Sequence, residues 1–448
     1  PARPLLRAAP ESDETQAVER HVRWAPLLWV LGVLHIGLAA LVAWRAVRDW
    51  PRGAVVNAIV ALWLATGIMQ ALSSVLNGIL QWDLARGLRN VLSLTSVGWV
   101  MVGLIVAAGA TSTLSLRQQS ALFSRLAIYT LLIGAGTQAG LSAGLPLTHF
   151  QSPVSWLLGS GEFSQAFTSI QLSVDEETLG TVVTRLILMY PWAPALGFGS
   201  LGLLLISTGT SHPALRAAGI AGGAFGVVFS WSRLAIVLAV VCVCALAVMR
   251  WPARVRLWLA LVLAMAGTAA WVASGQLPLL HEAATAIFEA RAGSSEARDL
   301  IYAESWRGFL ESPWVGWGWV GQSLHPTEYL PIGSHSSVFG TLYTGGLLVF
   351  VPFASAMLLT VAALLRSGGA SPAERHGRNV ALCLQLVMCV SSFYEALYSL
   401  ALPCWFYFHF IGKALAAEPL RTTVGPSRAS ALRDWSVPAR PEQESIHA

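Results

Sequence analysis

Residues 338–365, VFGTLYTGGLLVFVPFASAMLLTVAALL, form a run without a single charged side chain. A helix needs about 20 predominantly apolar residues to cross a bilayer, so this run is long enough to form a transmembrane helix. The whole chain is 55% hydrophobic and 11% charged, whereas soluble domains carry roughly a quarter charged residues. Composition therefore predicts a membrane protein with several spans.

Other apolar runs of similar length predict further spans. They lie at about Trp24–Trp44, Ala54–Leu72, Val91–Ala110, Ala121–Leu141, Pro191–Ser207, Leu215–Phe229, Leu234–Met249, Leu257–Ser274, Asn379–Ala396 and Leu397–Ala414. The runs are continuously apolar, which is typical of membrane helices. We expect an all-α polytopic membrane protein with about 11–12 transmembrane helices and a large loop that carries short amphipathic helices.

Arginines in the short connections predict the orientation of the spans. By alternation they fall on one side of the membrane, at Arg45, Arg48, Arg52, Arg117, Arg125, Arg216, Arg250, Arg254, Arg256, Arg366, Arg375 and Arg378. Basic connections favour the cytoplasmic side, so the net charge of +5 indicates membrane topology rather than nucleic-acid binding. The two long polar intervals, 142–190 and 275–337, then lie in the periplasm.

The domain organisation follows from this pattern. We expect a polar segment at 1–23, transmembrane helices over 24–274, a periplasmic loop with the candidate catalytic residues at 275–337, further transmembrane helices over 338–415 and a disordered cytoplasmic tail at 416–448. All five cysteines lie in apolar runs, which favours buried thiols over disulfides or a metal site. Phosphate-loop, dinucleotide and zinc-protease motifs are missing, so no cofactor is expected and ATP-driven transport is disfavoured.

The polar stretch 295–346, SEARDLIYAESWRGFLESPWVGWGWVGQSLHPTEYLPIGSHSSVFGTLYTGG, contains the candidate catalytic base. His335 directly precedes the apolar run, and an imidazole, whose usual pKa lies near neutrality, can take a proton from a hydroxyl. A histidine that caps the next helix, or lies exposed at the interface, is the alternative. His325 is a weaker candidate in the same interval.

Two arginines are candidates for binding an anion. Arg298 opens an amphipathic segment, and a guanidinium makes bidentate contacts to phosphate; an ion pair with Glu296 or Asp299 is the alternative. The same alternative makes Arg291 and Arg307 weaker candidates.

Arg233 and Glu395 are charged residues close to apolar runs. Arg233 lies between two of them, where a charge is costly unless it meets an anion or a water-filled cavity; snorkelling to the headgroups is the alternative. Glu395 either counters an arginine or histidine or lies at a helix end.

Glycines and tryptophans alternate between 314 and 321, which predicts tight turns with flat aromatic faces. Such faces suit sugar rings, although tryptophans also gather at the bilayer interface. The candidates for contacting sugar are Trp306, Trp314, Trp317 and Trp319.

Taken together, these motifs resemble the superfamily of O-antigen ligases and O-antigen or exopolysaccharide polymerases. The resemblance rests on Ser230-Trp-Ser-Arg233 at the end of a span, on Arg298…Trp306…Pro313-Trp-Val-Gly316-Trp-Gly318 in the outer loop, and on His335…Gly345-Gly-Leu347. It covers about residues 225–350. His335-Ser336 stands where ligases and many polymerases have His-Asn, which favours the polymerase branch.

The resemblance implies a metal-independent, inverting glycosyltransferase of the bacterial inner membrane. It would move a glycan from undecaprenyl diphosphate to a sugar hydroxyl on the periplasmic side. Arg233 and Arg298 would hold the diphosphate, and His335 would deprotonate or orient the acceptor. No nucleic acid takes part.

Three functions remain open from the sequence. A polymerase joins lipid-linked repeat units, whereas a ligase moves the finished polymer onto lipid A core or protein. A transporter or flippase is the third, but it predicts charged residues along a central path through the spans. Here the ionisable groups gather in one outer loop.

Overall fold

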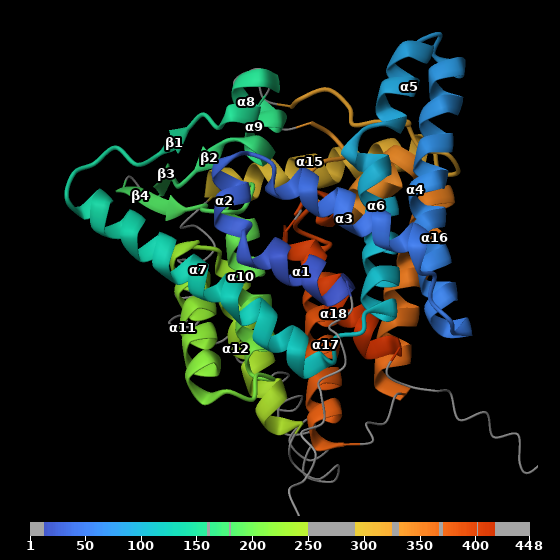
Figure 1. Cartoon of the computed structure of the whole chain (residues 1–448). Helices are drawn as coiled ribbons and strands as arrows, with labels where there is room; N and C mark the ends of the chain where they lie inside the picture. The colour runs from blue at the N-terminus through green and yellow to red at the C-terminus, as the bar shows by residue number, and fades with distance from the viewer. Residues whose placement is uncertain are drawn as a thin grey trace, which may run out of the picture.

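The computed structural model describes residues 13–158, 162–178, 181–249, 292–324, 331–366, 371–400 and 402–416. Helices dominate this part of the chain (Figure 1). They are α1 (Asp13–Arg23), α2 (Ala25–Val30), α3 (Leu34–Arg48), α4 (Ala54–Leu80), α5 (Leu84–Val91), α6 (Leu94–Thr111), α7 (Leu116–Ser142), α8 (Pro153–Leu158), α9 (Glu162–Thr168), α10 (Ala193–Ser207), α11 (Pro213–Phe229), α12 (Arg233–Val248), α15 (Ala292–Glu311), α16 (Ser337–Arg366), α17 (Pro372–Ser391), the 3-10 helix η1 (Leu397–Ser399) and α18 (Leu402–Ala416).

Within the described residues, four helices are long and apolar enough to cross a membrane. They are Ala54–Leu80, Leu84–Thr111, Leu116–Ser142 and Ser337–Arg366. Shorter apolar helices cover Leu34–Ala46, Ala193–Ser207, Pro213–Phe229 and Arg233–Val248. The predicted all-α polytopic membrane fold is confirmed. The span predicted at 257–274 lies outside the described residues.

Two predicted spans differ in the structure. The single span predicted at Trp24–Trp44 is wrong, because the chain turns between α2 and α3 at Gly32, which has a φ of 78°. The span predicted at Asn379–Ala396 is replaced by α17, which starts at Pro372 and ends at Ser391. The capping box formed by Ser371 and Glu374 explains the earlier start of α17.

The polar interval at 142–190 contains two small antiparallel sheets that were not predicted. One pairs β1 (His149–Phe150) with β2 (Ile170–Gln171), and the other pairs β3 (Ser173–Thr178) with β4 (Thr181–Leu186). The second hairpin is held partly by an ion pair between Glu176 of β3 and Arg185 of β4. This hairpin brings the guanidinium of Arg185 to the turn between α11 and α12, where it donates to Ser230 O.

The core surrounds α10 and α18, which are buried along almost their whole length. The contact of α18 with α6 depends on small residues: a Cβ at Gly109 would lie 2.0 Å from the backbone oxygen of His409, and one at Gly412 would lie 2.2 Å from that of Val106. Membrane helices approach each other closely at such positions. In Figure 1, α15 lies across the upper part of this bundle.

Helix α16 is broken at Gly346, which has a φ of 58°. The backbone groups freed by the break bond to the Gly-Trp segment, defined here as residues 312–319. Trp317 N donates to Tyr343 O at 2.9 Å and Gly318 N to Thr344 O at 2.8 Å. On the other side of the break, the N–H groups of Leu347 and Leu348 donate to the oxygens of Pro313 and Trp314.

A polar face of α4 holds the same segment. Ser74 Oγ donates to Gly318 O at 2.7 Å, and Gln70 Nε2 donates to the same oxygen at 3.2 Å. Asn77 Nδ2 donates to Gly316 O at 3.2 Å. Gly316 O also accepts from Ser312 Oγ, and Gly318 O also accepts from Asn90 Nδ2, so both carbonyls are fully paired within an apolar helix bundle. The segment is therefore built into the bundle.

Gly318→Ala is expected to destabilise the protein. Gly318 has a φ of 83°, and a Cβ there would lie 2.8 Å from the Cβ of Asn77. The left-handed backbone alone costs an L-residue about 1–2 kcal/mol. Thermal unfolding in detergent should show a lower midpoint for Gly318→Ala, whereas Gly136→Ala in α7, which has no atom within 4 Å of the added Cβ, should not lower it. Equal midpoints for all three proteins would contradict this role.

Candidate functional site

The candidate site forms where the loop before α16 meets the turn after α17. Ser337 N donates to the oxygens of Ser392 and Glu395, at 2.8 and 3.0 Å. Ser337 Oγ donates to Glu395 O at 3.0 Å and accepts from Leu397 N at 2.8 Å. Ser336 Oγ donates to Ser392 O and accepts from Phe339 N, which caps α16. Ser336 and Ser337 thus fix the position of the residue that precedes them, His335.

His335 has a left-handed backbone, with a φ of 59°. This conformation is uncommon for a residue other than glycine, and sites that over-determine it are often functional. Two bonds from α15 support it: Gly333 N donates to Ser305 Oγ at 2.8 Å, and Tyr302 Oη donates to His335 O at 3.3 Å. The backbone is thereby held against α15.

The hydrogen bonds of His335 determine its tautomer. Ser334 Oγ lies 2.6 Å from His335 Nδ1 and donates its single proton to Pro331 O at 2.6 Å. Ser334 Oγ must then accept a proton from His335 Nδ1–H. The lone pair of the neutral ring is therefore on Nε2, the nitrogen that faces away from Ser334.

The pKa of His335 lies at about 4, below the near-neutral value expected from the sequence. Burial is the largest cause, and the positive charge of Arg298 adds to it. The imidazole is consequently neutral at physiological pH. It can accept a proton, but as a weaker base than an exposed histidine.

Arg298 and Tyr302 lie four residues apart on α15, which places them on the same helical face. Tyr302 stacks on Phe339 of α16, with ring centroids 4.9 Å apart. Burial raises the pKa of Tyr302 to about 12, so its hydroxyl stays protonated and can donate. Helical spacing from Arg298 is the sequence signal that could have identified Tyr302.

Glu395 lies in the turn after α17 and pairs with Arg298, with 3.7 Å between Oε1 and Nη2. The carboxylate is 10% exposed and the guanidinium 33%. Burial raises the pKa of Glu395 to about 7, although Arg298, Arg185 and a hydrogen bond from Trp192 lower it. The group that titrates near neutrality is thus Glu395.

Arg185 of β4 is a second cation that sequence reasoning missed. It is 5% exposed, pairs with Glu176 and donates from Nε to Ser230 O at 2.9 Å. Its charge also acts on Glu395. The only sequence signal was a cation within the apolar run around 182–189, in an interval interpreted as a loop.

Arg233 begins α12, directly after the turn whose carbonyl Arg185 binds. Trp231 in this turn has a φ of 51°, and Ser230 Oγ accepts from Ser232 N at 3.2 Å. Ser232 then caps α12. Arg185 therefore connects the turn before Arg233 to the charges around Glu395.

The predicted sugar-contacting tryptophans fall into two groups. Trp317 donates from Nε1 to Gly308 O at 2.8 Å, and Trp319 is 7% exposed under Arg86, which lies 4.6 Å from its ring centroid. These two pack within the protein, because the Gly-Trp segment is bound to α4 and α16. Trp306 and Trp314 are exposed, at 46% and 72%.

The weaker candidates lie apart from this cluster or outside the described residues. Arg307 is 69% exposed and pairs with Glu304 of its own helix. Arg291 and His325 lie outside the described residues. In the described part of the chain, no group of three His, Cys, Asp or Glu side chains is placed to hold a metal ion.

The arrangement combines a cation on α15 with a buried carboxylate and a neutral imidazole in the two loops that meet it. A guanidinium can bind an anion, and a histidine with a free Nε2 can accept a proton from a hydroxyl.

Comparison with known proteins gives one family. Residues 218–354 match the sequence model of a family described as O-antigen ligase. The matched part includes Arg233, Arg298, His335 and the break at Gly346, whereas Arg185 and Glu395 lie outside it. No curated protein matches the chain. The match confirms the predicted resemblance: residues 218–354 of this multi-pass membrane protein are similar to the O-antigen ligase family.

Proposed function

We propose that the protein is a metal-independent, inverting glycosyltransferase that joins lipid-linked repeat units into O-antigen or exopolysaccharide at the periplasmic face of the inner membrane. The observation that carries the proposal is the placement of Arg298 beside a neutral His335 and a buried Glu395, within and next to the part of the chain that matches O-antigen ligases. The donor is a glycan on undecaprenyl diphosphate, and the acceptor is a sugar hydroxyl of a second lipid-linked unit.

In the proposed reaction, Arg298 binds the diphosphate of the donor, with Arg233 as the second phosphate-binding residue. His335 Nε2 takes the proton from the acceptor hydroxyl while its oxygen attacks the anomeric carbon. The bond from this carbon to the diphosphate oxygen breaks, and the lipid diphosphate leaves with the bonding electron pair. One displacement from the opposite face inverts the configuration. The exposed Trp306 and Trp314 are available for sugar rings.

Donor binding also strengthens the base. The charge of Arg298 contributes to the low pKa of His335. A diphosphate bound to Arg298 offsets this charge, so the pKa of His335 rises towards its usual value. His335 is therefore a stronger base with the donor bound than in the empty site, while burial, the larger cause of its low pKa, stays.

An O-antigen ligase is the second candidate, and the description of the matching family favours it. The same cluster serves both reactions, because only the acceptor differs: a lipid-linked unit for a polymerase, lipid A core or protein for a ligase. The transporter alternative gains no support from the cluster, whose groups suit anion binding and proton transfer.

A reconstituted assay separates the two reactions. Membranes that contain the protein are given a defined undecaprenyl-diphosphate repeat unit, with and without lipid A core. We expect chains longer than one repeat in both reactions, resolved by gel electrophoresis of the lipid-linked product. Product that appears only with the core, and without elongation on the carrier, would identify a ligase and contradict the polymerase proposal.

His335→Asn is expected to reduce transfer by about 10²–10⁴-fold, the usual contribution of a general base. Asparagine tolerates the left-handed backbone better than most residues, so this variant removes the imidazole without adding the strain that His335→Ala adds. The initial rate of glycan transfer measures the effect, and an unchanged unfolding midpoint shows that the fold is kept. Near-normal turnover by His335→Asn would refute the role of His335 as a base.

Glu395→Gln is expected to remove the pH dependence of donor binding near neutrality. Glu395 has a pKa of about 7, so it is mostly ionised above pH 7 and then competes with the diphosphate for Arg298. The donor KM of the unmodified protein should rise with pH by roughly fivefold, an electrostatic coupling of about 1 kcal/mol. Glu304→Gln, which breaks an exposed pair on α15, is the control and should keep this rise. A KM that rises equally in Glu395→Gln would contradict the competition.

A further inference from the structure

A cavity of about 240 Å³ lies where three helices begin. It is lined by the first turns of α7 and α17, by the chain that enters α11 and by the end of α10. The residues used below are Arg117, Ser120, Thr208, Ser211, Arg216 and His376. A second cavity of about 340 Å³ shares Thr208 and His376 with it and adds Arg375.

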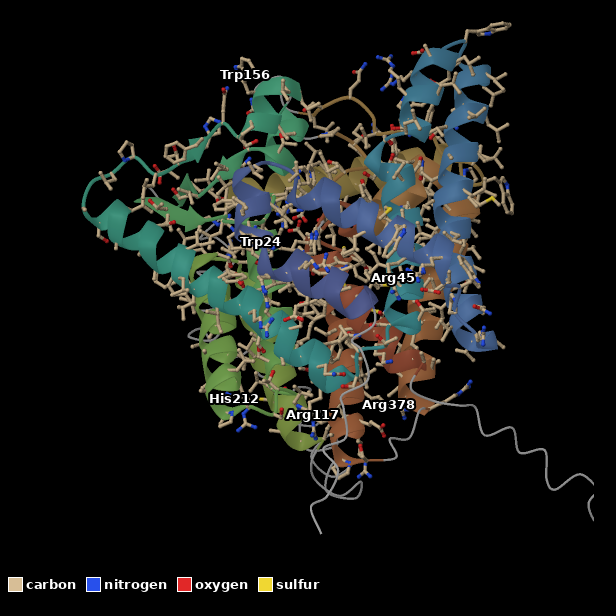
Figure 2. The ribbon with its side chains drawn as sticks, in the orientation of Figure 1. Trp24, Arg45, Arg117, Trp156, His212 and Arg378 are labelled. Atoms are coloured by element: carbon tan, nitrogen blue, oxygen red, sulfur yellow. The ribbon has the colours of Figure 1, made fainter. Side chains whose placement is uncertain are left out.

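The cavity lies at the end of the molecule remote from His335. Helix α17 contributes His376 and Gly377 to it, while the other end of α17 leads into the turn with Glu395. The 20 residues of α17 span roughly 30 Å, which is about the thickness of the hydrocarbon core. In Figure 2, Arg117 and His212 lie at the lower end of the helices and Trp156 lies at the opposite end.

The charges around the cavity favour an anion. Arg117 and Arg216 line it, and neither forms an ion pair with the residues that the structure describes. Among the residues that the structure describes, no aspartate or glutamate lines either cavity. Glu374, which precedes the cavity residue His376 by two positions, accepts from Ser371 N in the capping box of α17. Three helix N-termini add their partial positive charges.

One hydroxyl group, that of Ser120, supplies a directional donor to the same space. Ser120 is 1% exposed and lines the cavity, yet its hydroxyl forms no hydrogen bond within the described part of the chain. Thr208 Oγ1 donates to Leu205 O at 2.6 Å, so it accepts from His376 Nε2 at 2.9 Å. A buried hydroxyl without a partner is costly unless a ligand or water binds it.

We propose that this cavity binds a phosphate group, with Arg117 and Arg216 pairing with its charge and Ser120 donating a hydrogen bond. The ligand is either the headgroup of an acidic phospholipid or a free phosphate compound. Both present the same tetrahedral anion to arginines and helix N-termini. A basic pocket between helix ends suits the lipid headgroups of a negatively charged membrane surface.

Two probes distinguish the sources. In the first arm, the full chain is placed in nanodiscs of phosphatidylglycerol or of phosphatidylcholine, and native mass spectrometry counts the lipids that stay bound. In the second arm, equilibrium dialysis measures the binding of radiolabelled inorganic phosphate to the protein in neutral detergent. Retained phosphatidylglycerol without phosphate binding identifies a lipid headgroup, whereas phosphate binding identifies a free phosphate compound. Binding of neither probe overturns the proposal.

Variants test whether the bound anion occupies the cavity. The double variant, with Arg117→Gln and Arg216→Gln in one chain, is expected to weaken binding by about 30-fold. Each surface arginine removed accounts for roughly fivefold, and the lost hydrogen bonds account for the rest. Ser211→Trp keeps both arginines and fills the mouth of the cavity, so it should also abolish binding. Arg366→Gln removes an exposed arginine at the end of α16 and should leave binding unchanged. Binding that survives Ser211→Trp, or that Arg366→Gln weakens equally, overturns the proposal.

Discussion

The structure depends on the contact between the break in α16 and the Gly-Trp segment. A helix that is interrupted inside a membrane protein leaves backbone groups without partners, and each such group costs several kcal/mol in an apolar environment. Here the segment supplies those partners, and α4 binds its remaining carbonyls. Because α15 ends where the segment begins, the same contact also sets the position of Arg298 relative to His335.

The sequence predicted the helical membrane fold and several members of the site, for identifiable reasons. Continuous apolar runs define spans without any tertiary information. His335 and Glu395 stood out as ionisable groups at such runs, and Arg298 as the cation that opens an amphipathic segment of the outer loop. The structure brings these three together. Their roles in catalysis stay predictions.

Other features depend on tertiary contacts that periodicity does not encode. The Gly-Trp composition around Trp317 and Trp319 is typical of a sugar-binding surface. In the structure, however, contacts with Gly308 and Arg86 hold these two side chains within the protein. Arg185 had only the signal of a cation within an apolar run, because it acts through a hairpin formed by residues interpreted as a loop. The turn at Gly32 splits a run that was apolar enough to be one span. The near-neutral group is Glu395 rather than His335, because burial shifts their pKa values in opposite directions.

The polar face of α4 has a consequence for how the chain is made. Gln70, Ser73 and Ser74 are synthesised long before Val315 and Gly318, the residues whose carbonyls they bind. During biosynthesis α4 therefore enters the bilayer with amides and hydroxyls that have no tertiary partner until about 240 more residues have followed. Because of the order of translation, the polar side chains of α4 stay unpaired until the Gly-Trp segment is synthesised. A chain interrupted before that segment exposes these side chains as a polar stripe, which cellular quality control can recognise.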